Sequence, residues 1–258
     1  MTYETILYSE TDGLGILTLN RPDVMNALNS RMRAEIRMAV LSAGQSARVL
    51  VLTGAGRAFC SGQDLGDRAA LASLDLEATL RDEYEPMLRA LYDCPIPTIA
   101  AVNGVAAGAG ANLALGADVV IACESAAFIQ AFTRIGLIPD AGGTWVLPRQ
   151  IGLARATGAM LFADKIGARQ AADWGMIYEA VPDDAFAAHW LSRARQLACG
   201  PTVAYAALKQ ALRASPANDL DSQLALEARL QGRCGATADF REGVAAFVEK
   251  RPARFAGR

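Results

Sequence analysis

Hydrophobic and polar residues alternate over the first twenty positions, and the period then lengthens. The alternation in residues 4–20 is interrupted by Asp12 and Gly13, which is typical of two strands joined by a tight turn. From residue 26 to 43 the apolar side chains recur every three to four positions, which predicts a helix. The chain is therefore expected to begin with a hairpin followed by a helix.

Short and almost wholly apolar runs follow at residues 48–53, 98–102 and 119–122. Such runs favour strands that are covered on both faces. Helical segments between them require crossover connections, so we predict an α/β fold with a mostly parallel sheet.

The last third of the chain has helical spacing almost throughout, with no repeat and no low-complexity linker. Pro201 suits the first position of a helix, and Asp239 with Glu242 fits a capping box. This region is expected to pack on the same unit. The predicted helices are residues 168–174, 183–198, 201–212, 220–230 and 239–250.

The charge-free stretch at residues 94–117 is long enough to span a bilayer, but its composition argues against a membrane segment. It is rich in Ala and Gly, begins with Pro95 and Pro97, and contains Asn103 and Asn112, which are costly in lipid. We predict a buried strand, a glycine turn and a short helix. The first residues also lack the charged and apolar regions of an export signal.

The composition, 52% apolar and 20% charged over 258 residues with a net charge of -2, indicates a folded globular protein and argues against nucleic acid as the main partner. An RNA-binding face with Arg31, Arg33 and Arg37 remains a distant alternative, because Glu35 interrupts it. Five widely spaced cysteines without a C-x-x-C motif favour reduced thiols. We expect a cytoplasmic protein with no membrane partner.

Several kinds of chemistry lack their motifs. The single histidine, His189, lies in a helical pattern without a partner motif, and no hydrolase elbow, zinc-peptidase helix or Walker loop is found. Residues 54–56 read Gly-Ala-Gly after a predicted strand, but the pattern does not continue as a dinucleotide-binding loop. Acid–base work is therefore expected to fall to carboxylates, and no metal site is predicted.

Two glycine-rich segments are candidates for a reaction centre. Ala109 lies between glycines at a predicted helix start, where free N–H groups suit a developing oxyanion; tight strand–helix packing explains the glycines equally well. Asp140 precedes a glycine pair, where a carboxylate is more often a helix cap. In a water-poor pocket, the same carboxylate would be a base for a carbon acid.

Taken together, the ordered motifs resemble the crotonase, or enoyl-CoA hydratase/isomerase, superfamily. They are FCSGQDL at 59–65, AVNG at 101–104, GAG at 108–110 and IPDAGG at 138–143, with RPDVMNAL at 21–28 and AFVEKR at 246–251. The resemblance implies a spiral of ββα turns over residues 1–195. It also implies a helical region, 196–258, that packs on this core and on neighbouring subunits of a homotrimer or a hexamer.

The resemblance also implies a site for an acyl-CoA thioester, with no cofactor besides the CoA part of the substrate. The backbone N–H groups of Gln63 and Ala109 would form an oxyanion hole for the thioester carbonyl, and Asp140 would be the base. The substrate-binding residues implied are Met25, Ser61, Gly62, Asp64, Leu65, Gly108, Asn112, Phe132, Ile138 and Lys250.

The departures from the family pattern decide the expected reaction. Hydratases of this family use two glutamates to activate and deliver water, and here those positions are Asn112 and Phe132. Within the family the chain is most similar to isomerases that convert a phenylacetyl-CoA ring epoxide to an oxepin or move the 3-enoyl double bond to position 2. We therefore expect isomerisation with Asp140 as base. The apolar walls are expected from Tyr84, Phe132, Leu137, Ile138 and Trp145.

Two other functions remain open: a general isomerase or hydratase of fatty-acid oxidation, and a catalytically silent acyl-CoA-binding protein. For the CoA phosphates we expect contacts from scattered arginines and from Lys250 and Arg251 in the basic tail. A solvated helix end explains that tail equally well.

Overall fold

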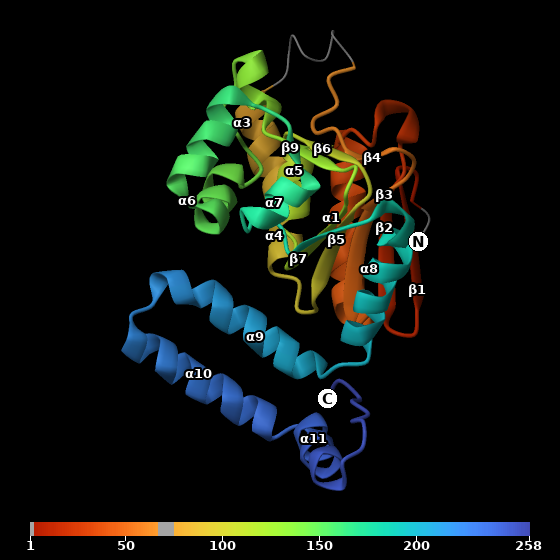
Figure 1. The fold of residues 1–258 in the computed structure, drawn as a ribbon, viewed down its shortest axis with the longest axis vertical. Helices are drawn as coiled ribbons and strands as arrows, with labels where there is room; N and C mark the ends of the chain where they lie inside the picture. Colours follow the sequence, from red (N-terminus) through yellow and green to blue (C-terminus); the bar gives the residue numbers. More distant parts are fainter. Residues whose placement is uncertain (1–2, 67–74) are drawn as a thin grey trace.

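The computed structural model describes residues 3–66 and 75–258 (Figure 1). A six-stranded sheet forms the centre of the core, in the order β1-β2-β3-β5-β7-β10. The β1–β2 hairpin is antiparallel and turns at Asp12 and Gly13, as predicted, and every other pairing in this sheet is parallel. Its strands are β1 (Ile6–Thr11), β2 (Leu14–Leu19), β3 (Val49–Gly54), β5 (Thr98–Val102), β7 (Val119–Cys123) and β10 (Glu179–Val181).

A second, four-stranded sheet lies beside the first in the order β4-β6-β8-β9. Each of its first three strands follows a strand of the large sheet directly, and helical structure comes next, so the chain climbs in ββα turns. The predicted α/β spiral is therefore confirmed. The strands are β4 (Ala58–Cys60), β6 (Val105–Ala107), β8 (Ala127–Ile129) and β9 (Ile166–Gly167).

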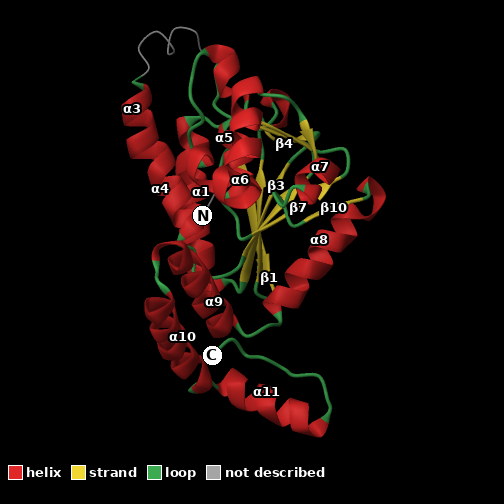
Figure 2. Ribbon diagram, turned by 60° about the vertical axis from the view of Figure 1, so that its left-hand side comes forward, coloured by secondary structure: helices red, strands yellow, loops and turns green. Residues whose placement is uncertain are grey.

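Helices cover the sheets, as Figures 1 and 2 show from two sides. The four residues Val49 to Leu52 of β3 are fully buried, because helices and neighbouring strands shield both of its faces. The helical elements are η1 (Pro22–Val24), α1 (Ser30–Ser46), α3 (Leu76–Thr79), η2 (Leu80–Tyr84), α4 (Glu85–Tyr92), α5 (Ala109–Leu115), η3 (Ala131–Ile135), α6 (Gly143–Phe162), α7 (Ala168–Asp173), α8 (Asp183–Ala198), α9 (Thr202–Ala214), η4 (Ser215–Ala217), α10 (Leu220–Gly235) and α11 (Ala238–Glu249).

Three predicted helix starts are wrong in detail. Helix α1 begins at Ser30 rather than at Asn26, because Asn26 has a left-handed φ of 57° and Asn29 caps the helix by accepting from the N–H of Met32. The capping box at the start of α11 does not form. Thr237 caps that helix, and Asp239 accepts hydrogen bonds from the C-terminal tail instead. Likewise, Pro201 is the N-cap of α9 and not its first residue.

The last three helices extend from one end of the core (Figures 1 and 2). Helix α9 is attached through Asp118, which pairs with Lys209 at 2.5 Å and with Arg213 at 2.9 Å. Helix α10 packs on α9 around Leu226 and Leu230. The boundary placed at residues 195–196 stays a prediction. In the part of the chain that is described, no helix is long and apolar enough to cross a bilayer.

Candidate active site

The Gly62–Gln63 turn lies beside the start of α5, which brings together the two residues predicted to form an oxyanion hole. Ala109 is the first residue of this helix, so its N–H precedes the helical hydrogen-bonding ladder. A Cβ atom built on Gly62 would lie 3.4 Å from the nitrogen of Ala109, which places the Gly62–Gln63 turn directly beside that nitrogen. Gly62 itself has a φ of +96°, a conformation that favours glycine.

The hydrogen bonds around Gln63 leave its own N–H out of the backbone pairing. Leu28 forms a parallel bridge with Gln63, in which the N–H of Leu28 donates to Gly62 at 2.8 Å and that of Asp64 donates to Leu28 at 3.1 Å. The N–H of Gln63 takes no part in that bridge. Gln63 and Ala109 are thus brought together as the resemblance implied.

Gly108 explains why the strand enters α5 so abruptly. Its φ of 53° with ψ of -129° is accessible to glycine but not to larger residues. A Cβ atom at this position would come within 3.8 Å of the Phe132 ring, which is buried at 6% exposure. Phe132 therefore fills the space beside Gly108, and it is not among the residues that line the cavity described below.

Asp140 lies in the loop before α6 and does not cap that helix. The N-cap residue is Gly142, and it makes no side-chain capping bond. The Oδ1 atom of Asp140 is buried without a hydrogen-bond partner among the described residues. Burial raises the pKa of Asp140 to about 6. The capping alternative is wrong, and the carboxylate is left with the desolvated environment of a general base.

A chain of amides fixes the backbone of Asp140. Asn112 donates from Nδ2 to the carbonyl oxygen of Asp140 at 2.8 Å, and Gln130 donates to Oδ1 of Asn112 at 2.8 Å. Gly143 leaves room for this arrangement, because a Cβ atom there would collide with the Asn112 amide. Asn112 therefore holds the backbone of Asp140 in place, and Gln130, which sequence reasoning missed, holds Asn112.

The side chain of Gln63 is held by two hydrogen bonds. Its Oε1 atom accepts from the hydroxyl of Tyr84 at 2.5 Å and from Nη1 of Arg33 at 3.0 Å. Arg33 is only 2% exposed and forms an ion pair with Glu83 at 2.6 Å. The idea of an RNA-binding arginine face is therefore wrong for Arg33, which is an internal residue.

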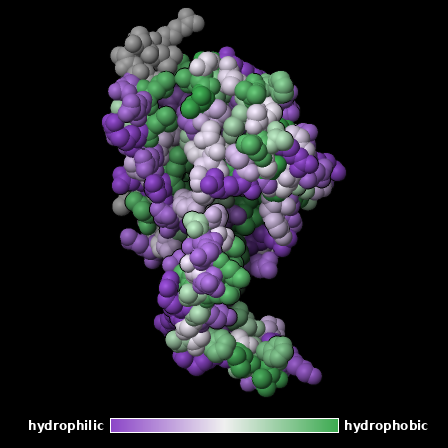
Figure 3. All heavy atoms as spheres, turned by 90° about the vertical axis from the view of Figure 1, so that its left-hand side faces the viewer, coloured by the Kyte–Doolittle hydropathy of each residue, from purple (hydrophilic) through white to green (hydrophobic). Residues whose placement is uncertain are grey.

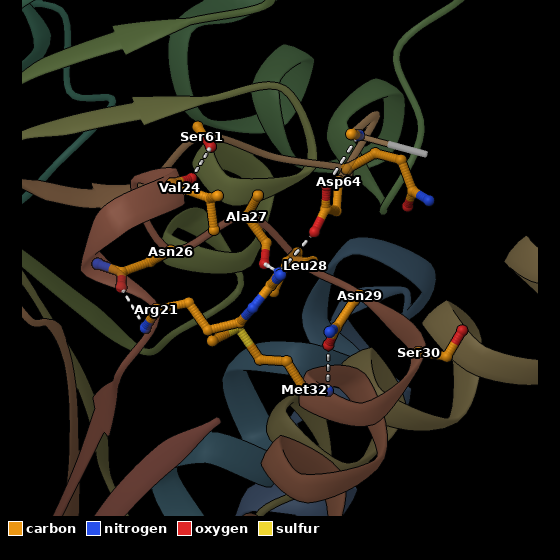
Figure 4. Close-up of polar contacts among 12 residues, drawn as sticks. Arg21, Val24, Asn26, Ala27, Leu28, Asn29, Ser30, Met32, Ser61 and Asp64 are labelled. Carbon is orange, nitrogen blue, oxygen red and sulfur yellow. Dashed lines mark hydrogen bonds and ion pairs between the residues drawn. The ribbon is translucent and has the colours of Figure 1, made fainter. Parts of the chain in front are cut away.

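The residues that flank Gln63 form a compact cluster, shown in Figure 4. Arg21 reaches both Asp64, at 2.7 Å, and the carbonyl oxygen of Ala27, at 2.6 Å. The N–H of Ser61 donates to Met25 at 3.0 Å. The predicted binding residues Met25, Ser61, Gly62 and Asp64 thus lie together around Gln63, and Leu65 follows with 45% exposure.

A cavity of about 830 Å³ opens next to Asp140. Tyr84, Leu137, Ile138 and Trp145 line it as predicted, with Ile138 at its exposed rim. The lining also includes Leu76, Leu80, Leu88, Tyr92, Asn112, Pro139 and Val146.

The far end of the chain lies away from this cavity. Lys250 caps the end of α11, at the opposite end of the molecule from α3 (Figure 1). Arg251 forms ion pairs with Glu242 and Glu249, both at 2.6 Å. A role of the tail in binding CoA phosphates stays a prediction. His189, on α8, is paired with Glu179 at 2.7 Å and lies outside the lining of the cavity.

Comparison with known proteins agrees with this geometry. Residues 9–258 match the family model for enoyl-CoA hydratase/isomerase. The chain belongs to the enoyl-CoA hydratase/isomerase family. A protein of Rhodobacter capsulatus named "Probable enoyl-CoA hydratase" is 64% identical over the full length of both chains. The "1,2-epoxyphenylacetyl-CoA isomerase" of Escherichia coli is 46% identical over 99% of each chain.

A solved structure from the same family shares the fold. The crystal structure of an enoyl-CoA hydratase from Bacillus anthracis superposes with a TM-score of 0.91 at 31% identity, covering 99% of this chain and 100% of that one. The relatives thus carry both hydratase and isomerase names, and both reactions occur in the family to which the chain belongs.

Proposed function

We propose that this member of the family is an acyl-CoA isomerase that works through a thioester enolate. Asp140 takes a proton from a carbon next to the thioester, and the electron pair moves into the carbonyl to form an enolate oxygen. The N–H groups of Gln63 and Ala109 stabilise that oxygen. Asp140 then returns the proton to a different carbon. These proton transfers need no metal ion and no cofactor besides the CoA part of the substrate.

The observation that carries this proposal is that a carboxylate oxygen of Asp140 is buried, while Asn112 and Phe132 stand at the two positions where hydratases of the family have glutamates. Water addition in this family relies on a pair of glutamates, whereas the amide of Asn112 is committed to the Asp140 backbone and Phe132 fills the space beside Gly108. Neither side chain exchanges a proton near neutral pH. A single desolvated carboxylate is sufficient to move a proton between two carbons in sequence.

The preferred substrates are 1,2-epoxyphenylacetyl-CoA, in which the bond between the two epoxide carbons breaks and the ring expands to oxepin-CoA, and 3-enoyl-CoA esters, in which the proton transfers alone give 2-enoyl-CoA. The 46% identity to the isomerase that is named for the first of these substrates supports this choice. The cavity lining is mostly aliphatic and aromatic, and its arginines are already paired, Arg81 with Asp82 at 2.9 Å and Arg89 with Glu85 at 3.3 Å. An uncharged, apolar acyl group therefore suits the cavity better than one with a distal carboxylate.

A general hydratase or hydratase/isomerase is the second candidate, favoured by the name of the relative at 64% identity. Incubation in deuterated water separates the two. With 3-hexenoyl-CoA, isomerisation through Asp140 places deuterium at the α or γ carbon of the thioester without a hydroxylated product. Efficient conversion of 2-butenoyl-CoA to 3-hydroxybutanoyl-CoA would refute the proposed isomerase. Tight binding without turnover of either ester or of the ring epoxide would indicate a silent binding protein.

We also propose that the chain assembles as a homotrimer or as a hexamer of two trimers. Large apolar side chains are exposed on the last three helices, and Figure 3 shows hydrophobic surface at the lower end of the molecule, where α11 lies. Size-exclusion chromatography with light scattering measures the mass of the particle in solution, and a monomer at micromolar concentration would contradict the proposed assembly. The exposed residues are Leu208, Leu212, Leu220, Leu224, Phe240, Val244, Phe247 and Val248.

A further inference from the structure

The side chain of Gln63 is engaged far more than a residue that acts through its backbone requires. Its Oε1 atom accepts two hydrogen bonds, from Tyr84 at 2.5 Å and from Arg33 at 3.0 Å. The donors come from two different elements, Arg33 from α1 and Tyr84 from the last position of η2. The oxyanion donor is therefore tied, through its own side chain, to two helical elements.

Arg33 makes further contacts with the backbone segment that bridges Gln63 and with η2. Its Nη1 atom also donates to the carbonyl oxygen of Leu28 at 2.8 Å, and Leu28 is the residue that bridges Gln63 in the backbone pairing. Its guanidinium lies 4.6 Å from the centre of the Tyr84 ring, and its counterion is Glu83, which directly precedes Tyr84. One buried cation thus holds Gln63, the Leu28 segment and the η2 turn together.

Tyr84 faces two ways. It is 2% exposed and lines the acyl cavity on which Asp140 also lies, while its hydroxyl donates to Gln63. Burial raises its pKa above the ordinary range, so the hydroxyl stays protonated and remains a donor at neutral pH. An acyl group in the cavity would therefore contact Tyr84, and Tyr84 is hydrogen-bonded to Gln63 of the proposed oxyanion hole.

We infer that Tyr84 and the Gln63 side chain form a clamp that holds the Gln63 N–H in its stabilising orientation and couples the oxyanion hole to the wall of the acyl cavity. Tyr84 is a positioning residue, since it acts on the thioester through Gln63. The role of the clamp in turnover rests on the proposed isomerase function. Its role in polarising a bound thioester carbonyl does not.

The test removes one hydroxyl. Tyr84→Phe keeps the ring against Arg33 and the cavity but deletes the short bond to Gln63 and the 3.5 Å bond that the hydroxyl accepts from Arg33, and kcat is expected to fall about tenfold with KM changed by less than about threefold. Gln63→Leu, which deletes the acceptor and keeps the backbone N–H, is expected to have a similar effect. Tyr178→Phe, which loses the hydroxyl of an exposed tyrosine outside the cavity lining, is the matched control and leaves both constants unchanged.

The double variant distinguishes a clamp from a tyrosine that merely lines the cavity. If Tyr84 acts through the Gln63 side chain, Tyr84→Phe adds almost nothing in the Gln63→Leu background. Independent roles would multiply the losses to about a hundredfold, and this result would overturn the inference. Circular dichroism and the melting temperature establish that each variant is folded.

A spectroscopic readout separates the clamp from the proposed reaction. Phenylacetyl-CoA with a ¹³C-labelled thioester carbonyl reports polarisation through its C=O stretching frequency, which should lie lower on the wild-type protein than on Tyr84→Phe or Gln63→Leu. An unchanged frequency in both variants would overturn the clamp even if the enzyme isomerises. A shifted frequency in a protein that turns over none of the proposed substrates would support the clamp and refute the isomerase.

Discussion

The side-chain oxygen of Gln63 accepts two hydrogen bonds and its backbone is bridged by Leu28, whereas Asp140 borders the cavity with a buried carboxylate oxygen that has no partner among the described residues. The first region presents backbone donors whose surroundings are fixed from several sides. The second presents an acceptor whose main chain is fixed by Asn112 while its side chain is left unsatisfied. Donors that stabilise a developing charge gain from being held rigidly, and a base gains basicity from the loss of hydration.

The largest expected effect comes from removing the base. Asp140→Asn keeps the size and most of the polarity of the side chain, so binding of an acyl-CoA should stay within a few-fold of wild type. Turnover should fall by about 10²- to 10⁴-fold, the range that a general base contributes. Steady-state kinetics with 3-hexenoyl-CoA and calorimetric binding of hexanoyl-CoA provide the two numbers. Activity close to wild type would exclude Asp140 as the base.

Removing an N–H donor from the oxyanion hole should lower turnover somewhat less than removing the base does. Ala109→Pro deletes the N–H at the first position of α5, where proline is tolerated, and kcat is expected to fall by about 10²- to 10³-fold. Ala109→Gly keeps the N–H and should lose far less activity. If the two variants lose activity equally while both remain folded, the N–H of Ala109 is not the feature that matters.

The unsatisfied carboxylate should also lower the stability of the fold. The pKa of Asp140 is raised to about 6, so the folded protein is destabilised as pH rises from about 4 through 6, and this cost is absent below that window. Asp140→Asn should therefore be more stable than wild type at pH 8, by about 3 kcal/mol at most. Urea unfolding at pH 8 and at pH 4 measures the difference. A variant that is less stable at pH 8 would show that the carboxylate is satisfied in the fold.

The smallest effect on turnover is expected from Asn112, which holds the backbone of Asp140. Asn112→Ala removes the hydrogen bond to the Asp140 carbonyl, and kcat should fall about tenfold because the carboxylate is held less accurately. Single-turnover rates at saturating substrate provide the measurement. A loss as large as that of Asp140→Asn would instead give Asn112 a direct part in the proton transfer.

The sequence was sufficient for features that depend on local pattern. The hairpin at Asp12 and the buried strands follow from alternation and from apolar runs, and glycine-flanked motifs singled out Asp140 and Ala109 as candidates. Helix α6 was not predicted, because Pro148 lies inside it and Gly152 interrupts it with a non-helical conformation. Pattern analysis expects a helix to end at such residues.

The contacts of the Gln63 side chain with Arg33 and Tyr84 could not be predicted from a local sequence pattern. Arg33 is 30 residues away from Gln63 in the sequence, and Tyr84 is 21 residues away. Hydrogen bonds between distant segments impose no periodicity, and an arginine among the polar positions of a helix is read as exposed. Only the packing of α1 against η2 and α4 makes Arg33 an internal residue.

The turn η2 has a π-helical form, and this geometry determines which side chains face the acyl cavity. Leu76, Leu80, Tyr84, Leu88 and Tyr92 all line the cavity at intervals of four residues. In an uninterrupted α-helix each interval would rotate the side chain about 40° beyond a full turn, or about 160° over the series. One extra residue in the turn takes back about 100° of that rotation and keeps the five side chains on one line. An α-helical turn of the same length would rotate Leu88 and Tyr92 by about 100° away from the cavity, whereas removal of one residue with the π-turn would leave them facing it, so the π-helical form of η2 decides which side chains border the cavity.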